Sequence, residues 1–155
     1  MIVHSEGPKC SCGNRGCLEA YAGRWAIERD IKSGIKAGRK SIIKDLVEGK
    51  IVSIKSKILA KALETNDPLV KKVLTEVCEM LGVACISLRH IFDPEIIIMG
   101  GGVIEACGNF MLPLIIKTAH MDVFFRGLKK CKIVASELGD DAIMLGAVAL
   151  VAGRI

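Results

Sequence analysis

Three cysteines stand within eight residues near the start of this chain, and a carboxylate follows them. Cys10, Cys12 and Cys17 have the spacing C-x-C-x4-C, and Glu19 comes two residues after the last cysteine. Thiolates that converge on one ion at ~2.3 Å are ligands of tetrahedral zinc, and the intervening glycines let the backbone fold around the ion. We therefore predict a zinc knuckle, with His4, six residues before Cys10, as the nearest candidate for a fourth ligand. A disulfide or a reduced, metal-free turn is the alternative.

The segment that carries these residues also matches a known motif. From Cys10 to Glu19 it reads C-x-C-G-x-x-G-C-x-E, which resembles the signature of the ROK family, a group of sugar kinases and sugar-responsive repressors. The resemblance implies that the three cysteines join a histidine around a structural zinc and that Glu19 binds a sugar. The family's histidine lies ten residues before the first cysteine, one position before Met1, which leaves His4 as the candidate. A purely structural role for Glu19, as a helix cap, is the alternative.

Two further segments resemble the family's pattern. Asp93 to Gly102 matches D-P-E-x-I-x-x-G-G-G, and Leu138 to Ala147 matches L-G-D-x-A-x-x-x-G-A. The first is expected to end a strand, where glycines let a ligand approach the backbone and the next helix offers free N–H groups. The resemblance places the adenosine of ATP against the three glycines that end this segment: Gly100, Gly101 and Gly102. It places Gly146 close to a neighbouring helix or the nucleotide. A strand-to-helix turn without a ligand is the alternative.

The resemblance covers only part of a kinase. ROK kinases also have an amino-terminal half with a D-x-G-x-T phosphate loop and a catalytic aspartate, and neither pattern occurs in these 155 residues. The chain therefore resembles the carboxy-terminal half of a glucokinase-like enzyme that transfers the γ-phosphoryl of ATP, with Mg²⁺, to a sugar hydroxyl. We expect the isolated chain to be inactive, because positioned phosphates and a base are what this chemistry needs.

Two other functions are compatible with the same motifs. One is a sugar-sensing or oligomerisation module of a ROK transcriptional repressor. The other is a zinc-stabilised half that assembles with a separate amino-terminal chain. Apolar surface intended for that missing half would also favour a homo-oligomer.

The elements that must position these residues follow from periodicity and capping signals. Apolar residues at helical spacing predict a helix over Leu18 to Lys32, which puts Glu19 at its positive amino end. Asp67 and Pro68 are typical of a helix start. The predicted helices cover 18–32, 51–64, 68–89, 103–123 with an interruption around Pro113, and 142–152. One predicted strand lies in the run from Phe92 to Gly102, with a loop at its carboxyl end, and the other covers 132–136.

This order of elements predicts an α/β fold. The all-apolar run at 96–99 is typical of a buried parallel strand. The family resemblance implies the carboxy-terminal lobe of an actin-like ATPase (ribonuclease H-like) fold, with helices on both faces of the sheet. We expect a single domain over 1–155, in which 1–19 form the zinc knuckle and sugar-contact loop and 20–155 form the helical and nucleotide-side part.

Composition excludes several classes of protein. With 51% hydrophobic and 25% charged residues, the chain can form one core. Its longest apolar run, 142–153, is shorter than the ~20 residues of a membrane helix, and no signal segment begins the chain, which predicts a cytoplasmic protein without a membrane segment. The net charge of +5 comes from lysines at helical intervals, with one Trp and one Tyr, and this indicates a solvated face and no nucleic-acid binding.

The other cysteines and histidines are predicted to be structural. Seven cysteines, an odd number, indicate a reducing compartment. Four of them are predicted to be small buried hydrophobic residues: Cys78, Cys85, Cys107 and Cys131. His90 and His120 have no partner at the spacing of a metal site or a catalytic triad.

Overall fold

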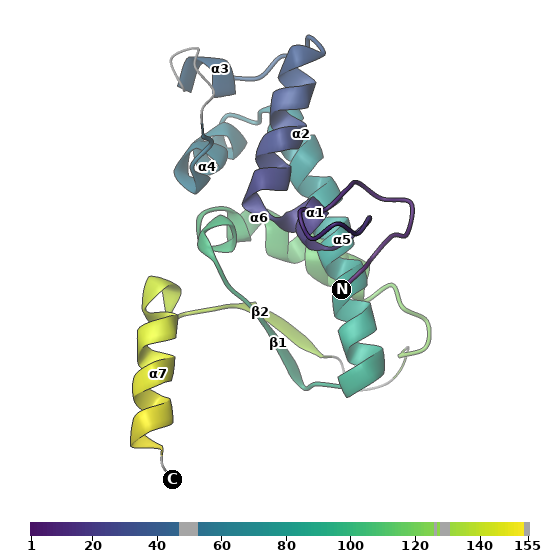
Figure 1. The fold of residues 1–155 in the computed structure, drawn as a ribbon, viewed down its shortest axis with the longest axis vertical. Helices are drawn as coiled ribbons and strands as arrows, with labels where there is room; N and C mark the ends of the chain where they lie inside the picture. The colour runs from purple at the N-terminus through teal and green to yellow at the C-terminus, as the bar shows by residue number, and fades with distance from the viewer. Residues whose placement is uncertain (47–52, 126, 128–130, 154–155) are drawn as a thin grey trace.

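The fold is described by a computed structural model for residues 1–46, 53–125, 127 and 131–153 (Figure 1). In chain order its elements are α1 (Glu19–Ala22), α2 (Arg24–Lys36), α3 (Ile43–Leu46), α4 (Ser56–Glu64), α5 (Pro68–Phe92), β1 (Ile96–Met99), α6 (Gly102–Ala119), β2 (Lys132–Ala135), a 3-10 turn η1 (Gly139–Asp141) and α7 (Ala142–Ala152). The long helices α5 and α6 lie side by side, and α2 and α4 pack against them.

The start of α5 is fixed by a buried carboxylate. Asp67 Oδ1 accepts hydrogen bonds from the backbone N–H groups of Leu69 and Val70, both at 2.9 Å. Asp67 Oδ2 accepts from the Ser41 hydroxyl and from the Ile42 N–H, both at 2.7 Å. Asp67 therefore caps α5, as predicted, and also ties α5 to the segment that leads into α3.

The helix α6 packs closely on α5 and supplies part of the core. A side chain at Gly82 of α5 would collide with Thr118 of α6. The predicted interruption at Pro113 is wrong, because α6 is continuous through this residue. Pro113 and Asn109, whose carbonyl loses its helical partner, are both exposed, so water can take the place of the missing hydrogen bond. By length and composition α6 is the one helix of the described chain that could cross a membrane, a test that core helices also pass.

The sheet is small and is covered on one face. β1 and β2 pair in parallel, as predicted, with Ile97 opposite Ile133. Ile97 and Ile133 face the core formed with the helices. The prediction of a buried strand is wrong for β1, because Ile96 and Ile98 on its other face are 47% and 62% exposed. No helix among the described residues covers that face (Figure 1).

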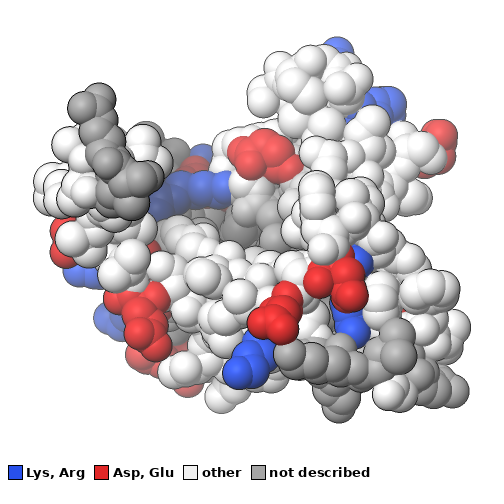
Figure 2. Space-filling model, turned by 90° about the horizontal axis from the view of Figure 1, so that it is seen from below, with Lys and Arg blue, Asp and Glu red and all other residues white. Residues whose placement is uncertain are grey.

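The final helix stands apart from the rest of the chain. Figure 1 shows α7 beside the main body, joined to it through η1, and none of the described residues of α7 is buried. Gly146 makes no close packing contact within the described part of the chain, since no heavy atom outside the neighbouring helical backbone lies within 4 Å of the place its side chain would take. Figure 2, which views the molecule from below, shows uncharged surface between separate groups of acidic and basic side chains. The apolar sequence of α7 therefore faces outward.

Two predicted helix boundaries are also corrected. The helix expected from Leu18 to Lys32 is divided at Gly23, whose extended ψ of 143° separates α1 from α2. The helix expected from Ile51 begins at Ser56, because Ser53 to Lys55 are not helical, and residues 51 and 52 lie outside the described residues. In both places the helical spacing of apolar residues in the sequence extends past the boundary of the helix in the structure.

The four isolated cysteines are buried, as predicted: Cys78, Cys85, Cys107 and Cys131. Burial raises the pKa of Cys78 to about 12 and the pKa values of Cys85 and Cys107 to about 11. These thiols are therefore protonated and act as small apolar side chains.

Candidate functional site

The segment before α1 folds into a tight loop that gathers three thiols. The Cys10 N–H donates to the Asn14 carbonyl at 2.8 Å, and the Gly13 N–H donates to the Cys10 carbonyl at 3.1 Å. Gly16 has a positive φ of 67°, and any side chain there would collide with the His4 carbonyl. Glycine is therefore required at this point of the loop.

The three sulfur atoms have the arrangement of a metal site. Cys10, Cys12 and Cys17 place their Sγ atoms within 4.8 Å of one another, and the Cys12 and Cys17 sulfurs are 3.6 Å apart. Sulfurs at ~2.3 Å from a tetrahedral zinc would be about 3.8 Å apart, so the set fits this ion. All three thiols are free, so the disulfide alternative is not found.

Ionisation of the three thiols would be stabilised by a bound cation. Burial, followed by contacts with the other two thiols, raises the pKa of Cys17 to about 11. The Asn14 backbone N–H and the neighbouring thiols lower the pKa of Cys12. Several thiolates this close repel one another, and a divalent cation between them would remove that repulsion.

The predicted fourth ligand does not join this group. His4 is exposed, and its Nδ1 lies 3.1 Å from the Tyr21 hydroxyl. The set of metal-binding side chains found among the described residues comprises the three cysteines without His4. The structure therefore brings together three of the four predicted ligands.

Glu19 is the first residue of α1, so it lies at the amino end of a helix as predicted, although this helix has four residues and does not continue to Lys32. Its Oε1 accepts a hydrogen bond from Trp25 Nε1 at 3.0 Å. No side-chain cap bonds this helix start, so the Glu19 carboxylate is not used as a cap. A side chain at Gly23 would collide with the carboxylate, which shows that glycine leaves the space in which Glu19 lies. Its Oε2 has no hydrogen-bond partner in the described part of the chain and can accept from a ligand hydroxyl.

The glycine turn after β1 borders a cavity. Gly101 has a positive φ of 103° and stands before the first residue of α6, where no side chain caps the helix. A cavity of about 260 Å³ is lined by the turn together with apolar side chains such as Met99, Leu81 and Met111. Three glycines thus give a ligand access to the backbone at the amino end of an 18-residue helix.

A larger cavity lies next to this turn. It has a volume of about 800 Å³ and is bounded by α2, α4 and the start of α6. Its charged lining consists of four cationic side chains, Arg24, Lys55, Lys57 and Lys61, and two carboxylates, Glu64 and Glu105. Sequence reasoning assigned these lysines to a solvated face, because helical spacing does not reveal that α6 stands opposite them.

A sequence profile described as "ROK family" matches residues 1–154. This chain belongs to the ROK family. It is 35% identical to a glucokinase of Thermotoga maritima over the whole chain and 48% of that protein. It is 32% identical to the DNA-binding transcriptional dual regulator NagC of Escherichia coli over 96% of the chain and 35% of that protein.

A solved ROK structure has the same fold as this chain. The crystal structure of a ROK family glucokinase from Streptomyces griseus, in complex with glucose and AMPPNP, matches 97% of the chain with a TM-score of 0.81 and 28% identity. The match covers 49% of that glucokinase. The chain thus has the α/β fold of ROK sugar kinases and spans less than half the length of the relatives it matches.

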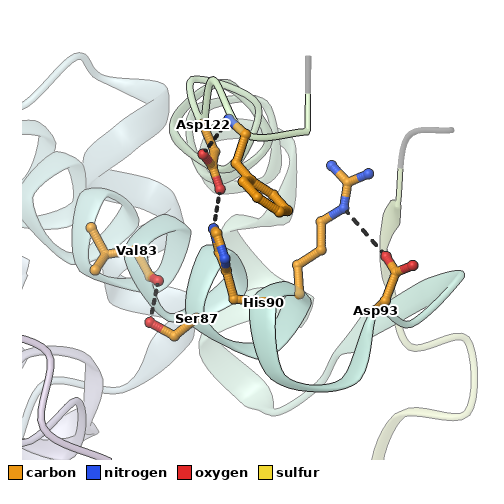
Figure 3. A network of polar contacts seen from close by, with 7 residues as sticks. Val83, Ser87, His90, Asp93 and Asp122 are labelled. Atoms are coloured by element: carbon orange, nitrogen blue, oxygen red, sulfur yellow. Dashed lines mark hydrogen bonds and ion pairs between the residues drawn. The ribbon is translucent and has the colours of Figure 1, made fainter. Parts of the chain in front are cut away.

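Sequence reasoning missed one polar cluster, which lies away from these cavities (Figure 3). His90 Nε2 of α5 lies 2.6 Å from the Asp122 carboxylate, and the Phe124 N–H donates to the same carboxylate at 2.9 Å. The Ser87 hydroxyl donates to the Val83 carbonyl at 3.2 Å and not to His90, so no catalytic triad is formed here. The pair instead ties the end of α5 to the connection after α6, which agrees with the predicted structural role of His90.

Proposed function

We propose that this chain is the carboxy-terminal half of an ATP-dependent ROK sugar kinase. The observation that carries the proposal is the basic cavity beside the glycine turn. Four cationic side chains line this cavity against two carboxylates, Glu64 and Glu105. A neutral sugar does not require this excess of positive charge, whereas the phosphates of ATP and its Mg²⁺ complex remain anionic and are attracted to it.

In this proposal each predicted residue has a distinct task. Cys10, Cys12 and Cys17 hold a structural zinc, and His4 or another donor completes its coordination. Zinc fixes the loop that leads into α1, so that Glu19 presents a carboxylate to two hydroxyls of the sugar. The turn formed by Gly100, Gly101 and Gly102 approaches the adenosine of ATP.

The proposal leaves Gly146 and the partner of this chain to be tested. The outer face of the sheet and the helix α7 expose large apolar side chains, among them Ile98 at 62% and Ile143 at 85%. Surfaces of this kind are usually covered by protein. We propose that an amino-terminal half, or a second copy of the chain, covers them, and that Gly146 meets its neighbour or the nucleotide in that assembly. The proposed compartment is the cytoplasm.

The second candidate is the sugar-sensing module of a ROK repressor, supported by the 32% identity to NagC over 96% of the chain. Calorimetric titration of the purified chain with MgATP and with glucose separates the two functions. A chain that binds MgATP supports the kinase. A chain that binds glucose but does not bind MgATP supports the repressor module. A second assay measures glucose phosphorylation by the chain alone, and we expect none. A measurable rate of glucose phosphorylation would contradict the expectation that the chain alone is inactive.

A further inference from the structure

Arg24 stands where the proposed sugar and nucleotide regions meet. It is the first residue of α2 and directly follows Gly23, the residue that gives Glu19 its space. Its side chain lines both the cavity of about 800 Å³ and the cavity of about 260 Å³. No other cationic side chain of the described chain lines both of these cavities.

The guanidinium of Arg24 is held in place by α4. Arg24 Nη2 donates to Ser56 Oγ at 2.9 Å, and Ser56 is only 8% exposed. This one bond uses part of the guanidinium, which has five N–H donors in a planar fork. The remaining donors can bind an anion, and the bond to a buried hydroxyl reduces the entropy lost when they do so.

The same point lies against the start of α6. A side chain at Gly102 would approach Ser56 Oγ at 3.4 Å and Arg24 Nη2 at 3.6 Å. The fixed guanidinium and the positive end of an 18-residue helix are therefore adjacent. Glycine at position 102 keeps the space between them open. An anion in this space would meet a full positive charge from one side and backbone N–H groups from the other.

The lining of the larger cavity carries both signs of charge. Its four cationic side chains stand with two carboxylates, Glu64 at the end of α4 and Glu105 in the first turn of α6. The net charge of the lining is positive, so an anionic ligand is attracted to it.

We infer that Arg24 binds the phosphate chain of the nucleotide and that Ser56 positions it for this contact. The inference rests on the proposed kinase function and adds a specificity residue to it. Arg24 would distinguish ATP from adenosine, which has the same base and sugar but no charge. It would also connect the nucleotide to the sugar side, because Glu19 and Arg24 belong to one short stretch of chain.

The test is calorimetry of the purified full chain with three probes: MgATP, adenosine and tripolyphosphate. Arg24→Gln removes the charge and is expected to weaken binding of MgATP and tripolyphosphate about tenfold, the usual effect of losing a charge-assisted hydrogen bond. Adenosine affinity is expected to be unchanged. Ser56→Ala keeps the charge but frees the guanidinium, and we expect a loss of about threefold for the two anions. Arg39→Gln removes the same group from an exposed position outside both cavities and should have no effect.

The outcomes separate this inference from the proposed function. If MgATP binds equally well to Arg24→Gln and Arg39→Gln, the inference is wrong and the kinase proposal stands. If tripolyphosphate binds in an Arg24-dependent way but MgATP does not bind, the anion site is supported and the kinase proposal is wrong. If neither anion binds, both are wrong. Thermal unfolding of each variant shows whether the fold is intact, and Arg24→Gln and Arg39→Gln are expected within a few degrees of the parent because both arginines are exposed.

Discussion

Replacing Asp67 by alanine is expected to destabilise the chain by about 3 kcal/mol. The Asp67 carboxylate is 2% exposed and accepts four hydrogen bonds of 2.7 to 2.9 Å. Two of them cap α5, and the loss of such a cap costs about 1 kcal/mol. The other two hold the segment before α3, where the Ile42 N–H would be left without its acceptor at a cost of about 2 kcal/mol.

Asp67→Asn separates these two contributions. The amide oxygen can still cap α5, but the amide NH₂ would face the Ile42 N–H and the Ser41 hydroxyl, which are donors to Asp67. We expect a loss of about 1 to 2 kcal/mol. Asp45→Ala removes an exposed carboxylate on α3 as a matched control and should change stability by less than about 0.5 kcal/mol.

The assay is equilibrium unfolding in urea followed by circular dichroism, with the three variants compared at the same slope. For a chain of 155 residues, 3 kcal/mol also corresponds to a fall in Tm of about 9 °C. A loss below about 1 kcal/mol for Asp67→Ala would refute the reasoning, because it would show that the segment before α3 does not depend on the carboxylate.

Three other predictions concern the knuckle, the helix interface and the acid stability of the chain. Elemental analysis should find one zinc per chain. Chelation or Cys12→Ser should remove the zinc and lower the thermal stability, whereas the neighbouring Ser11→Ala should retain both. Zinc retained by Cys12→Ser would contradict the ligand set. Gly82→Ala should destabilise the chain by about 2 kcal/mol in urea unfolding, because the alanine side chain would collide with Thr118. This loss outweighs the better helix propensity of alanine. In the control Gly108→Ala the nearest neighbour of the new side chain is at 3.7 Å, so this variant should be neutral or stabilising. The Phe124 N–H, followed by His90, lowers the pKa of Asp122, so its contribution to stability is complete above the unfolded pKa of about 3.9 and is lost as the pH falls through the lower folded value. In Asp122→Asn the free energy of unfolding should therefore change less with pH below about pH 4 than in the parent chain. The same pH dependence in both would count against this contact.

Much of the site could be predicted because its determinants are local in the sequence. The cysteine spacing brings three sulfurs together within one loop, and the residue after Leu18 begins a helix, so Glu19 lies at a positive helix end. The cap at Asp67 and the positive φ of Gly101 are likewise decided by neighbouring residues. The family motif added the roles of these residues, which the spacing by itself does not give.

What could not be predicted depends on residues that are distant along the chain. Arg24 and Ser56 are 32 positions apart, as are His90 and Asp122, and no local pattern pairs them. The exposure of Ile98 and of α7 likewise reverses the expectation from their apolar sequence. An apolar sequence predicts that a surface is buried, whereas only the tertiary structure shows which apolar surfaces are buried within the described chain. The sequence by itself thus determined the thiol cluster, the carboxylate and the glycine turn, because each is built within one turn of the backbone. The tertiary structure alone decided the basic cavity and the uncovered face, because both arise from how separate helices and strands are arranged in space.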